Sequence, residues 1–329
     1  MDRKILILKN DRVGDLFHSL RNIEHLIKNY SNSSIEIYLS NINIRFSKIL
    51  NYKNVTIKKF NFNLTIYEKF SLLLKLLINK YDYVLILTPK SFYFYLPILF
   101  KKVKFLGICV DGKQRNRPNK FLRKYLYKYE VNDRSNNKSK QTIYNLEKKL
   151  LNQIISNFDK IKINNKVNKN VNKNSINILF HYKSELFGDI QENLQSILNI
   201  FLEITATSEA SFSISTDLEL KNSYNLIIRK IKNYEKIRFL GSVEADELIN
   251  VIGGSDIVIS PHGAISCIGA YYDKHIIDIF DRNITRNAFR EFKPHTNGHY
   301  QFIFKSENKN VMKIKLLYKI NNLIKLVNK

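Results

Sequence analysis

Short apolar, β-rich runs alternate with helix-length segments along this chain of 329 residues, and no other feature constrains its fold as strongly. Such alternation is typical of βα units that build parallel sheets. The first half predicts strands at residues 4–9, 34–40, 54–60, 82–88 and 103–109. The second half predicts strands at residues 176–182, 211–217, 237–241, 256–260 and 275–280. The pattern therefore predicts an α/β protein with parallel sheets.

A polar, low-complexity stretch at residues 161–175 separates the two halves, and its Asn- and Lys-rich composition cannot bury enough surface to fold alone. The length of the chain favours two domains of about 150 residues. We predict an N-terminal Rossmann-like domain at 1–160, a linker at 161–175 and a C-terminal Rossmann-like domain at 176–329. The helical spacing at 311–327 predicts a terminal packing helix, which either stays on the second domain or crosses back onto the first.

The composition limits the kinds of partner and the cellular compartment that we expect for the protein. A formal net charge of +25 suits an anionic partner, although a compositional drift toward Lys explains much of it equally well. Two isolated cysteines, Cys109 and Cys267, fit a reducing compartment. The apolar run at 5–8 is too short for a signal peptide, and no run reaches the roughly 20 residues that span a bilayer. We expect a cytoplasmic protein whose membrane contact, if any, is peripheral.

The first predicted strand runs into the segment 9–15, which reads KNDRVGD, and a helix is expected to begin near Leu16. Gly14 lets the backbone approach a ligand at that helix terminus, where negative charge is favoured. Asp15 then lies either at the mouth of a binding cleft or in a capping role for its helix. The GxGxxG and GxxxxGK[ST] patterns are absent, which argues against a dehydrogenase and an ATPase.

A second small-residue loop follows the predicted strand at 256–260 and reads PHGAISCIGA over residues 261–270. Small residues at a strand-to-helix turn let a phosphate sit against backbone N–H groups. A tight packing turn explains the same pattern about as well.

Taken in order, these segments resemble the heptosyltransferases of glycosyltransferase family 9. The stretch at 5–21 looks like the strand, GD turn and helix of the family, and the stretch from Leu240 to Phe280 looks like its donor-binding region. The resemblance implies the GT-B fold, with two Rossmann-like domains whose parallel sheets face an interdomain cleft, where ligands of open α/β sheets sit.

The resemblance also implies a reaction. An inverting, metal-independent transferase would move a heptose or related sugar from a nucleotide donor to a lipopolysaccharide-type or other surface glycan, with Asp15 as general base. The nucleotide sugar, ADP-linked in the family, is a co-substrate, and no cofactor or metal is expected. Lys183 and the 262–267 turn would meet the diphosphate, although Lys183 fits an exposed strand-end lysine as well. The predicted donor-binding residues are Lys183, Gly241, Ser260, His262, Gly263, Ala264, Ser266 and Cys267. The predicted acceptor-binding residues are Gly14, His18, Arg115 and Arg117.

The donor loop departs from the family pattern. Where the family carries an Asp, a Thr or Ser, a Gly and a nearby His, this chain has His262, Gly263, Ala264 and Cys267. A donor other than ADP-heptose is therefore plausible, and a catalytically inactive relative is an alternative.

Residues 101–140 hold thirteen Lys or Arg against three acids, with aromatic residues between them. This composition suits an anionic glycolipid acceptor or leaflet. It also suits RNA, bound through phosphates and stacking, or an ordinary solvated helix. A basic nucleic-acid-binding α/β protein is therefore the alternative function. No RRM, KH or zinc-ligand signature is present, so nucleic acid is not the expected partner.

Overall fold

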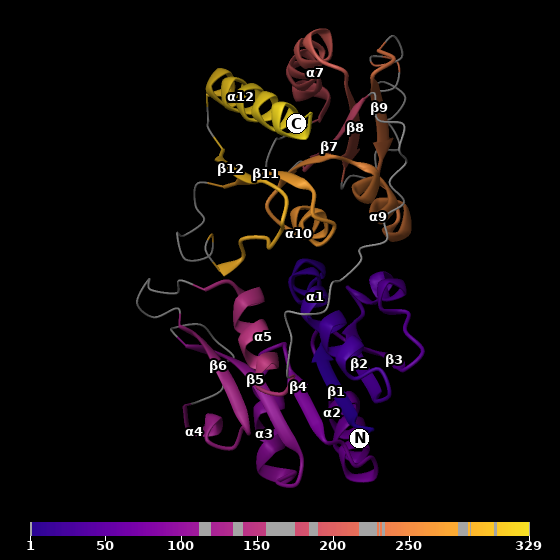
Figure 1. The fold of residues 1–329 in the computed structure, drawn as a ribbon, viewed down its shortest axis with the longest axis vertical. Helices are drawn as coiled ribbons and strands as arrows, with labels where there is room; N and C mark the ends of the chain where they lie inside the picture. Colours follow the sequence, from indigo (N-terminus) through magenta and orange to yellow (C-terminus); the bar gives the residue numbers. More distant parts are fainter. Residues whose placement is uncertain are drawn as a thin grey trace. The chain divides into compact units, whose positions relative to one another are not determined.

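The computed structural model describes residues 2–111, 120–133, 141–155, 175–183, 190–216, 229, 231, 234–281, 289, 291–305 and 308–328. The chain divides into two compact units (Figure 1). The first unit comprises Met1–Asn164 and Thr285–Lys293, and the second comprises Asn165–Ile284 and Pro294–Lys329. Apart from Ser175, the predicted linker lies outside the described residues.

The first unit is built on a parallel sheet of six strands with the order β3-β2-β1-β4-β5-β6. The strands are β1 (Lys4–Lys9), β2 (Ser34–Ser40), β3 (Val55–Phe60), β4 (Tyr83–Ile86), β5 (Lys104–Asp111) and β6 (Lys128–Asp133). This is the doubly wound order in which the chain reverses direction between β1 and β4. In such sheets ligands bind beside the carboxyl ends of the strands at the reversal, which places β1 at the expected site.

Helices cover both faces of this sheet. The helices are α1 (Val13–Asn29), α2 (Ile66–Ile78), α3 (Ser91–Leu99), α4 (Lys120–Arg123) and α5 (Ile143–Asn152), with a 3-10 helix at Ile44–Leu50. Leu6 and Leu8 of β1 share a core with α2, α3 and α4, whereas α1 and α5 pack against each other. The α2 helix begins with a capping box between Thr65 and Glu68, which satisfies two backbone donors at its start.

The second unit repeats the same topology with the order β12-β11-β10-β7-β8-β9, again parallel throughout. Its strands are β7 (Ile176–Tyr182), β8 (Ala210–Thr216), β9 (Ile237–Gly241), β10 (Ile257–Pro261), β11 (His275–Phe280) and β12 (Tyr300–Phe304). Its helices are α7 (Ile190–Thr207), α9 (Ala245–Gly254), α10 (Ala264–Tyr271) and α12 (Lys309–Val327). The chain reverses between β7 and β10, so the 261–263 turn occupies the switch point of this sheet.

Each of the ten predicted strands is present, with ends that differ by at most two residues. Strands β6 and β12 were not predicted. Both are edge strands, and polar residues interrupt their apolar pattern, as in the sequence of Lys128–Asp133.

One prediction about a helix is corrected, and one open alternative is decided. The helix expected near Leu16 begins at Val13, because the Leu16 N–H already donates to the Arg12 carbonyl at 3.1 Å. The sequence leaves open on which unit the terminal helix α12 packs, and the structure assigns it to the second unit. Its buried residues Leu316, Ile320 and Leu323 join the core of the second unit, which α7 and the sheet also line.

The segment Thr285–Lys293 belongs to the first unit, although the sequence places it among residues of the second. Within this segment the buried Glu291 accepts a hydrogen bond from Asn132 Nδ2 at 2.8 Å. The ring of Phe292 lies 6.4 Å from the ring of His18. These contacts explain why the segment groups with β6 and α1.

Candidate active site

Asp15 lies in the first turn of α1, directly after the carboxyl end of β1. Gly14 and Asp15 are both half-buried and, contrary to the sequence expectation, both are inside the helix rather than before it. The Asp15 carboxylate accepts a hydrogen bond from the backbone N–H of Arg12, the residue that precedes the helix. Arg12, and not Asp15, is therefore the residue that caps the helix, and the hydrogen bond from its N–H fixes the position of the Asp15 carboxylate.

A buried charged cluster lies under Asp15. Lys9, the last residue of β1, is 1 % exposed, and its Nζ lies 2.9 Å from Asp11 Oδ2 and 3.4 Å from Glu147 Oε1. Glu147 is fully buried on α5 and accepts hydrogen bonds from Ser19 Oγ at 2.6 Å and Asn22 Nδ2 at 3.5 Å. One buried cation is thus shared by carboxylates from two segments far apart in the sequence, which ties α1 and α5 to the end of β1.

Asp11 is held from three sides. Thr88 Oγ1 donates to its Oδ2 at 3.0 Å, and Asn43 Nδ2 approaches its Oδ1 at 3.4 Å. The backbone carbonyl of Asp11 accepts from Ser40 Oγ at 2.6 Å. The loop after β1 is therefore fixed by groups that follow β2 and β4, the strands on either side.

The cluster changes the pKa values of its members. Burial lowers the pKa of Lys9, but the charges of Asp11, Glu147 and Asp15 outweigh it, so the pKa lies above its ordinary value. Burial raises the pKa of Asp11 to about 6, against the opposing effect of Lys9. Burial also raises the pKa of Asp15, which the charges of Lys9 and Arg12 oppose. A half-buried carboxylate with a raised pKa beside a fixed cation has the character of a general base.

Of the other predicted acceptor-binding residues, the structure describes His18 but not the two arginines. His18 is 5 % exposed on α1 and packs beside Phe292, so its ring is part of the interior of the unit. Arg115 and Arg117 lie outside the described residues, as does much of the basic stretch at 101–140. Asp15 and Gly14 are therefore the predicted acceptor-side residues that the structure brings together at the end of β1.

In the second unit the 261–263 turn connects β10 to α10. Gly263 has φ 156° and ψ −146°, a conformation that essentially only glycine adopts. A Cβ added to it would meet no described atom within 4 Å, so the backbone is open at this point. The N–H groups of Ala264, Ile265 and Ser266 belong to the first turn of α10 and have no acceptor inside the helix. Such a turn can bind an anion.

Ser266 shapes this turn from inside. It is fully buried, and its Oγ accepts from the Gly263 N–H at 3.2 Å and donates to the Gly263 carbonyl at 3.0 Å. The Gly263 N–H is therefore already used. Cys267, predicted as a donor residue, is 3 % exposed and faces the interior, which makes it a packing residue of α10.

His262 is held by residues from neighbouring strands. Its Nδ1 lies 2.8 Å from Asp278 Oδ2 on β11, and its ring stacks on Phe280 with centroids 4.3 Å apart. The Tyr300 hydroxyl of β12 donates to the same Asp278 oxygen at 3.0 Å. Burial and the Asp278 charge raise the pKa of Tyr300, so the phenol stays protonated. Because the carboxylate is an acceptor, His262 carries its proton on Nδ1 when neutral and presents Nε2 as an acceptor.

We call His262, Asp278 and Tyr300 the His262 cluster. Two buried oxygens, Ser260 Oγ and Asp278 Oδ1, have no hydrogen-bond partner among the described residues. Ser260 and Asp278 are register partners on adjacent strands, so their side chains leave the sheet on the same face. Buried polar atoms are normally paired, and a bound ligand or water would account for both.

The remaining predicted donor residues are spread along the sheet. Lys183 is half-buried just after β7, the strand next to β10. Gly241 ends β9, which is three strands from β10 and therefore roughly 14 Å away at the usual strand spacing. The structure thus groups Lys183 with Ser260, His262, Gly263 and Ala264, and leaves Gly241 apart from them.

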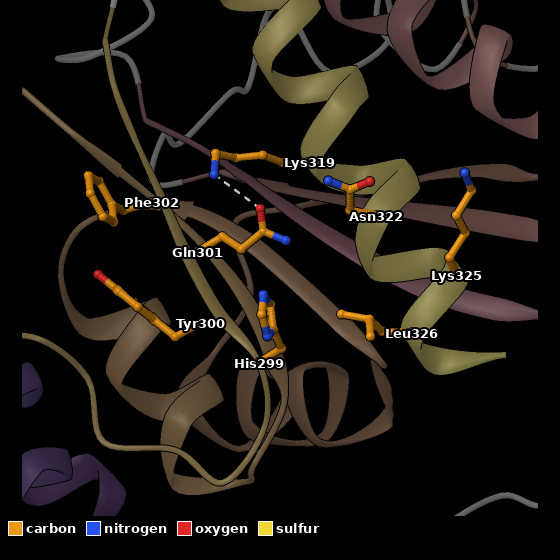
Figure 2. A pocket seen from close by; sticks show the side chains of 8 residues that line it. All are labelled: His299, Tyr300, Gln301, Phe302, Lys319, Asn322, Lys325 and Leu326. Carbon is orange, nitrogen blue, oxygen red and sulfur yellow. Dashed lines mark hydrogen bonds between the residues drawn. The ribbon is translucent and has the colours of Figure 1, made fainter. Parts of the chain in front are cut away.

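A groove of about 560 Å³ lies elsewhere on the second unit, between edge strand β12 and α12. Figure 2 shows Lys319 reaching from α12 toward Gln301 on β12, to which its Nζ donates at 3.1 Å. Apart from Tyr300, the residues that line it are separate from the His262 cluster.

Sequence reasoning missed Lys9, Asp11, Glu147, Asp278 and Tyr300. A signal existed for two of them, because Lys9 ends an apolar strand and Asp278 interrupts the apolar run at 276–280. A charged residue at such a position is rarely buried without a partner. Tyr300 carried no comparable signal, since its strand was not predicted.

This chain is similar to known proteins in structure but not detectably in sequence. No protein-family model and no curated protein matches the sequence. Solved structures of bacterial glycosyltransferases are among those similar to this chain. A glycosyl transferase family 9 protein from Veillonella parvula has a TM-score of 0.62 and 10 % identity, covering 95 % of this chain and 89 % of that chain. The E. coli ADP-heptose lps heptosyltransferase II has a TM-score of 0.63 and 12 % identity, covering 99 % and 100 %.

A UDP-GlcNAc 2-epimerase from Methanocaldococcus jannaschii is also similar, with a TM-score of 0.56 and 15 % identity, covering 95 % of this chain and 92 % of that chain. Transferases and epimerases therefore share this architecture, and function has to be argued from the site. The comparisons confirm the structural resemblance to family 9 that the sequence predicts. The chain has a GT-B-like α/β fold of two Rossmann-like units, each with a parallel sheet.

Proposed function

We propose that this chain is an inverting glycosyltransferase that moves a sugar from a nucleotide donor to a glycan or glycolipid acceptor, with Asp15 as general base. One observation carries the proposal: in a fold shared with heptosyltransferases over nearly the whole chain, a positioned carboxylate stands at the end of β1 beside a buried cation. Fold analogy alone would not distinguish a transferase from an epimerase.

Asp15 suits proton removal from an attacking hydroxyl. As the acceptor oxygen attacks the anomeric carbon from the face opposite the leaving nucleotide, its proton passes to the carboxylate. Lys9 and Arg12 favour the ionised carboxylate, which has to accept that proton, while burial strengthens it as a base. Burial and the two cations thus act in opposite directions on the pKa of this carboxylate, which supports its role as a proton acceptor.

The second unit supplies the donor side of the proposal. The α10 turn offers backbone N–H groups around Ala264 to a diphosphate, and Lys183 stands at the end of the adjacent strand. His262, oriented by Asp278 and Tyr300, takes the polar role that the family assigns to other residues of this loop. We propose a nucleotide sugar, first of all an ADP-linked heptose, as the co-substrate, and a reaction without a metal.

For the acceptor we propose an anionic surface glycan or glycolipid of the lipopolysaccharide type, met by the basic first unit. A glycolipid acceptor would place the reaction at the cytoplasmic face of the inner membrane. No described helix is long and apolar enough to cross a bilayer.

Thermal unfolding across a panel of nucleoside diphosphates and nucleotide sugars tests the donor side. A ligand that binds only the folded state at 100 times its Kd stabilises it by about 2.7 kcal/mol. We expect a shift with one nucleotide series, a smaller shift in His262→Ala, and an unchanged shift in His299→Ala, since His299 is exposed at the start of β12.

The nucleotide sugar that raises the thermal midpoint is then incubated with the protein and a bacterial glycolipid extract, and its turnover is measured. Release of the nucleoside diphosphate supports the transferase. Binding without release would indicate an inactive relative, and salt-sensitive binding to RNA with no nucleotide shift would favour a nucleic-acid-binding protein.

A further inference from the structure

The α2 helix exposes a continuous apolar surface. Its inward residues Leu72 and Leu76 are buried in the core of the first unit. Its outward residues are also large and apolar, and their exposed fractions are 85 % for Ile66, 79 % for Tyr67, 57 % for Phe70, 43 % for Leu74, 68 % for Leu77 and 77 % for Ile78. A helix on the surface of a soluble domain normally turns charged or polar residues outward, so a helix with large apolar residues on its outward face as well calls for a partner.

The neighbouring helix α3 extends this surface. Its exposed residues Tyr95 and Leu99 are 54 % and 64 % accessible, whereas Phe94 and Leu96 are buried in the same core as Leu72. Lys69 Nζ of α2 lies 5.8 Å from the centroid of the Phe92 ring of α3, so the two helices are neighbours. Figure 1 shows both at the end of the first unit that carries the N-terminus. We call the six exposed apolar side chains of α2, together with Tyr95 and Leu99 of α3, the α2–α3 face.

The charge around the α2–α3 face is positive. Residues 53–110 contain ten lysines and only two acids, Glu68 and Asp82. Glu68 is used in the capping box at the start of α2, and Asp82 pairs with Arg3 and accepts from the Lys4 N–H. Most of these lysines are exposed: Lys53, Lys58, Lys59, Lys80, Lys101, Lys102 and Lys104.

We propose that the α2–α3 face docks the protein onto a bilayer that contains anionic phospholipid. Apolar side chains of an interfacial helix insert at the boundary of headgroups and acyl chains, while lysines beside them bind lipid phosphates. A second copy of this chain is the less suitable occupant, because pairing two such faces would bring two sets of lysines together. The inference rests on this surface alone and does not depend on the proposed transfer reaction.

Co-sedimentation with vesicles tests the proposal. We expect the full chain to sediment with vesicles of phosphatidylglycerol and phosphatidylcholine and to bind pure phosphatidylcholine more weakly. The triple variant Phe70→Gln, Leu74→Gln and Leu77→Gln is expected to bind the anionic vesicles at least about tenfold more weakly, because buried apolar area sets the affinity. The double variant Lys101→Gln and Lys102→Gln is expected to lose about fivefold for each lysine removed.

A matched control is available on another helix. Ile314 and Tyr318 of α12 are each 66 % exposed, and Ile314→Gln with Tyr318→Gln should leave vesicle binding unchanged. Thermal midpoints of all variants establish that they fold. Absence of binding by the unaltered chain would overturn the proposal, as would equal losses in the α2 and α12 variants. A concentration-dependent dimer that the triple α2 variant abolishes would assign the face to a second copy instead.

Discussion

Lys9 shows how a single buried charge can organise a site. It is 1 % exposed and lies within salt-bridge distance of Asp11 and Glu147. Removing one partner of such a pair leaves the others buried and uncompensated, which typically costs 3–5 kcal/mol.

We therefore predict that Lys9→Met lowers the free energy of unfolding by about 3 kcal/mol in urea titrations at pH 7. Lys53→Met, at an exposed position, serves as the control and should change stability by less than about 0.5 kcal/mol. A Lys9→Met protein as stable as the unaltered chain would show that the cluster does not depend on this cation.

Asp11 gives the site a defined dependence on pH. Its pKa is about 6 in the folded protein against an ordinary value of 3.8, because burial outweighs the attraction of Lys9. The folded state therefore binds more protons than the unfolded chain between about pH 4 and 6. It follows that the contribution of Asp11 to the free energy of unfolding falls as the pH rises through this window.

We predict that Asp11→Asn reduces this fall by on the order of 2 kcal/mol between pH 4 and pH 7, as measured by denaturant unfolding at each pH. We compare how steeply the free energy of unfolding changes with pH in the two proteins, because the substitution also removes the contact with Lys9 and so changes stability at every pH. Asp2→Asn, at an exposed position, should leave the slope unchanged. Parallel curves for Asp11→Asn and the unaltered chain would contradict the raised pKa.

At the scale of elements, the β10–α10 turn depends on one glycine. Gly263 adopts φ 156° and ψ −146°, which side-chain-bearing residues avoid at a cost of about 1–3 kcal/mol. Gly254, at the end of α9, also has open space around its Cβ position but no positive φ, so it is a matched control.

We predict that Gly263→Ala lowers the free energy of unfolding by about 1–3 kcal/mol and weakens nucleotide binding, because the turn has to shift. Gly254→Ala should be neutral or stabilising by up to about 1 kcal/mol. Thermal unfolding with and without nucleotide separates the two effects. Similar behaviour of both variants would mean that the conformation of Gly263 is not required.

The elements also show where sequence patterns are informative. Fully buried strands such as Ile5–Leu8 read as apolar runs whichever way they pair, and these were predicted with nearly correct ends. An edge strand needs only one buried face, so β12, with Gln301 between aromatic residues, resembles a loop in sequence. The sequence predicts too late a start for α1, because Arg12 and Val13 carry no capping signal.

At the scale of the molecule, two sheets of identical strand order each place a polar turn at a topological switch point. The sequence is sufficient to predict this repetition and the places of Asp15 and His262 in the segments that follow β1 and β10, while the roles of the two residues stay predictions. It is not sufficient for the partners of these residues. Glu147 reaches Lys9 across 138 positions and Asp278 meets Tyr300 across 22, and contacts of this kind arise only when the strands and helices pack.

The rate of glycosyl transfer by the Asp15→Asn variant tests most directly whether Asp15 is the general base. Asn keeps the size of the side chain and removes the charge, so donor binding should persist while kcat falls about 10²–10⁴-fold, the usual contribution of a general base. Asp246→Asn, exposed on α9, is the control and should retain full activity. A transfer rate in Asp15→Asn equal to that of the unaltered chain, with the donor-induced thermal shift intact, would contradict the proposed mechanism.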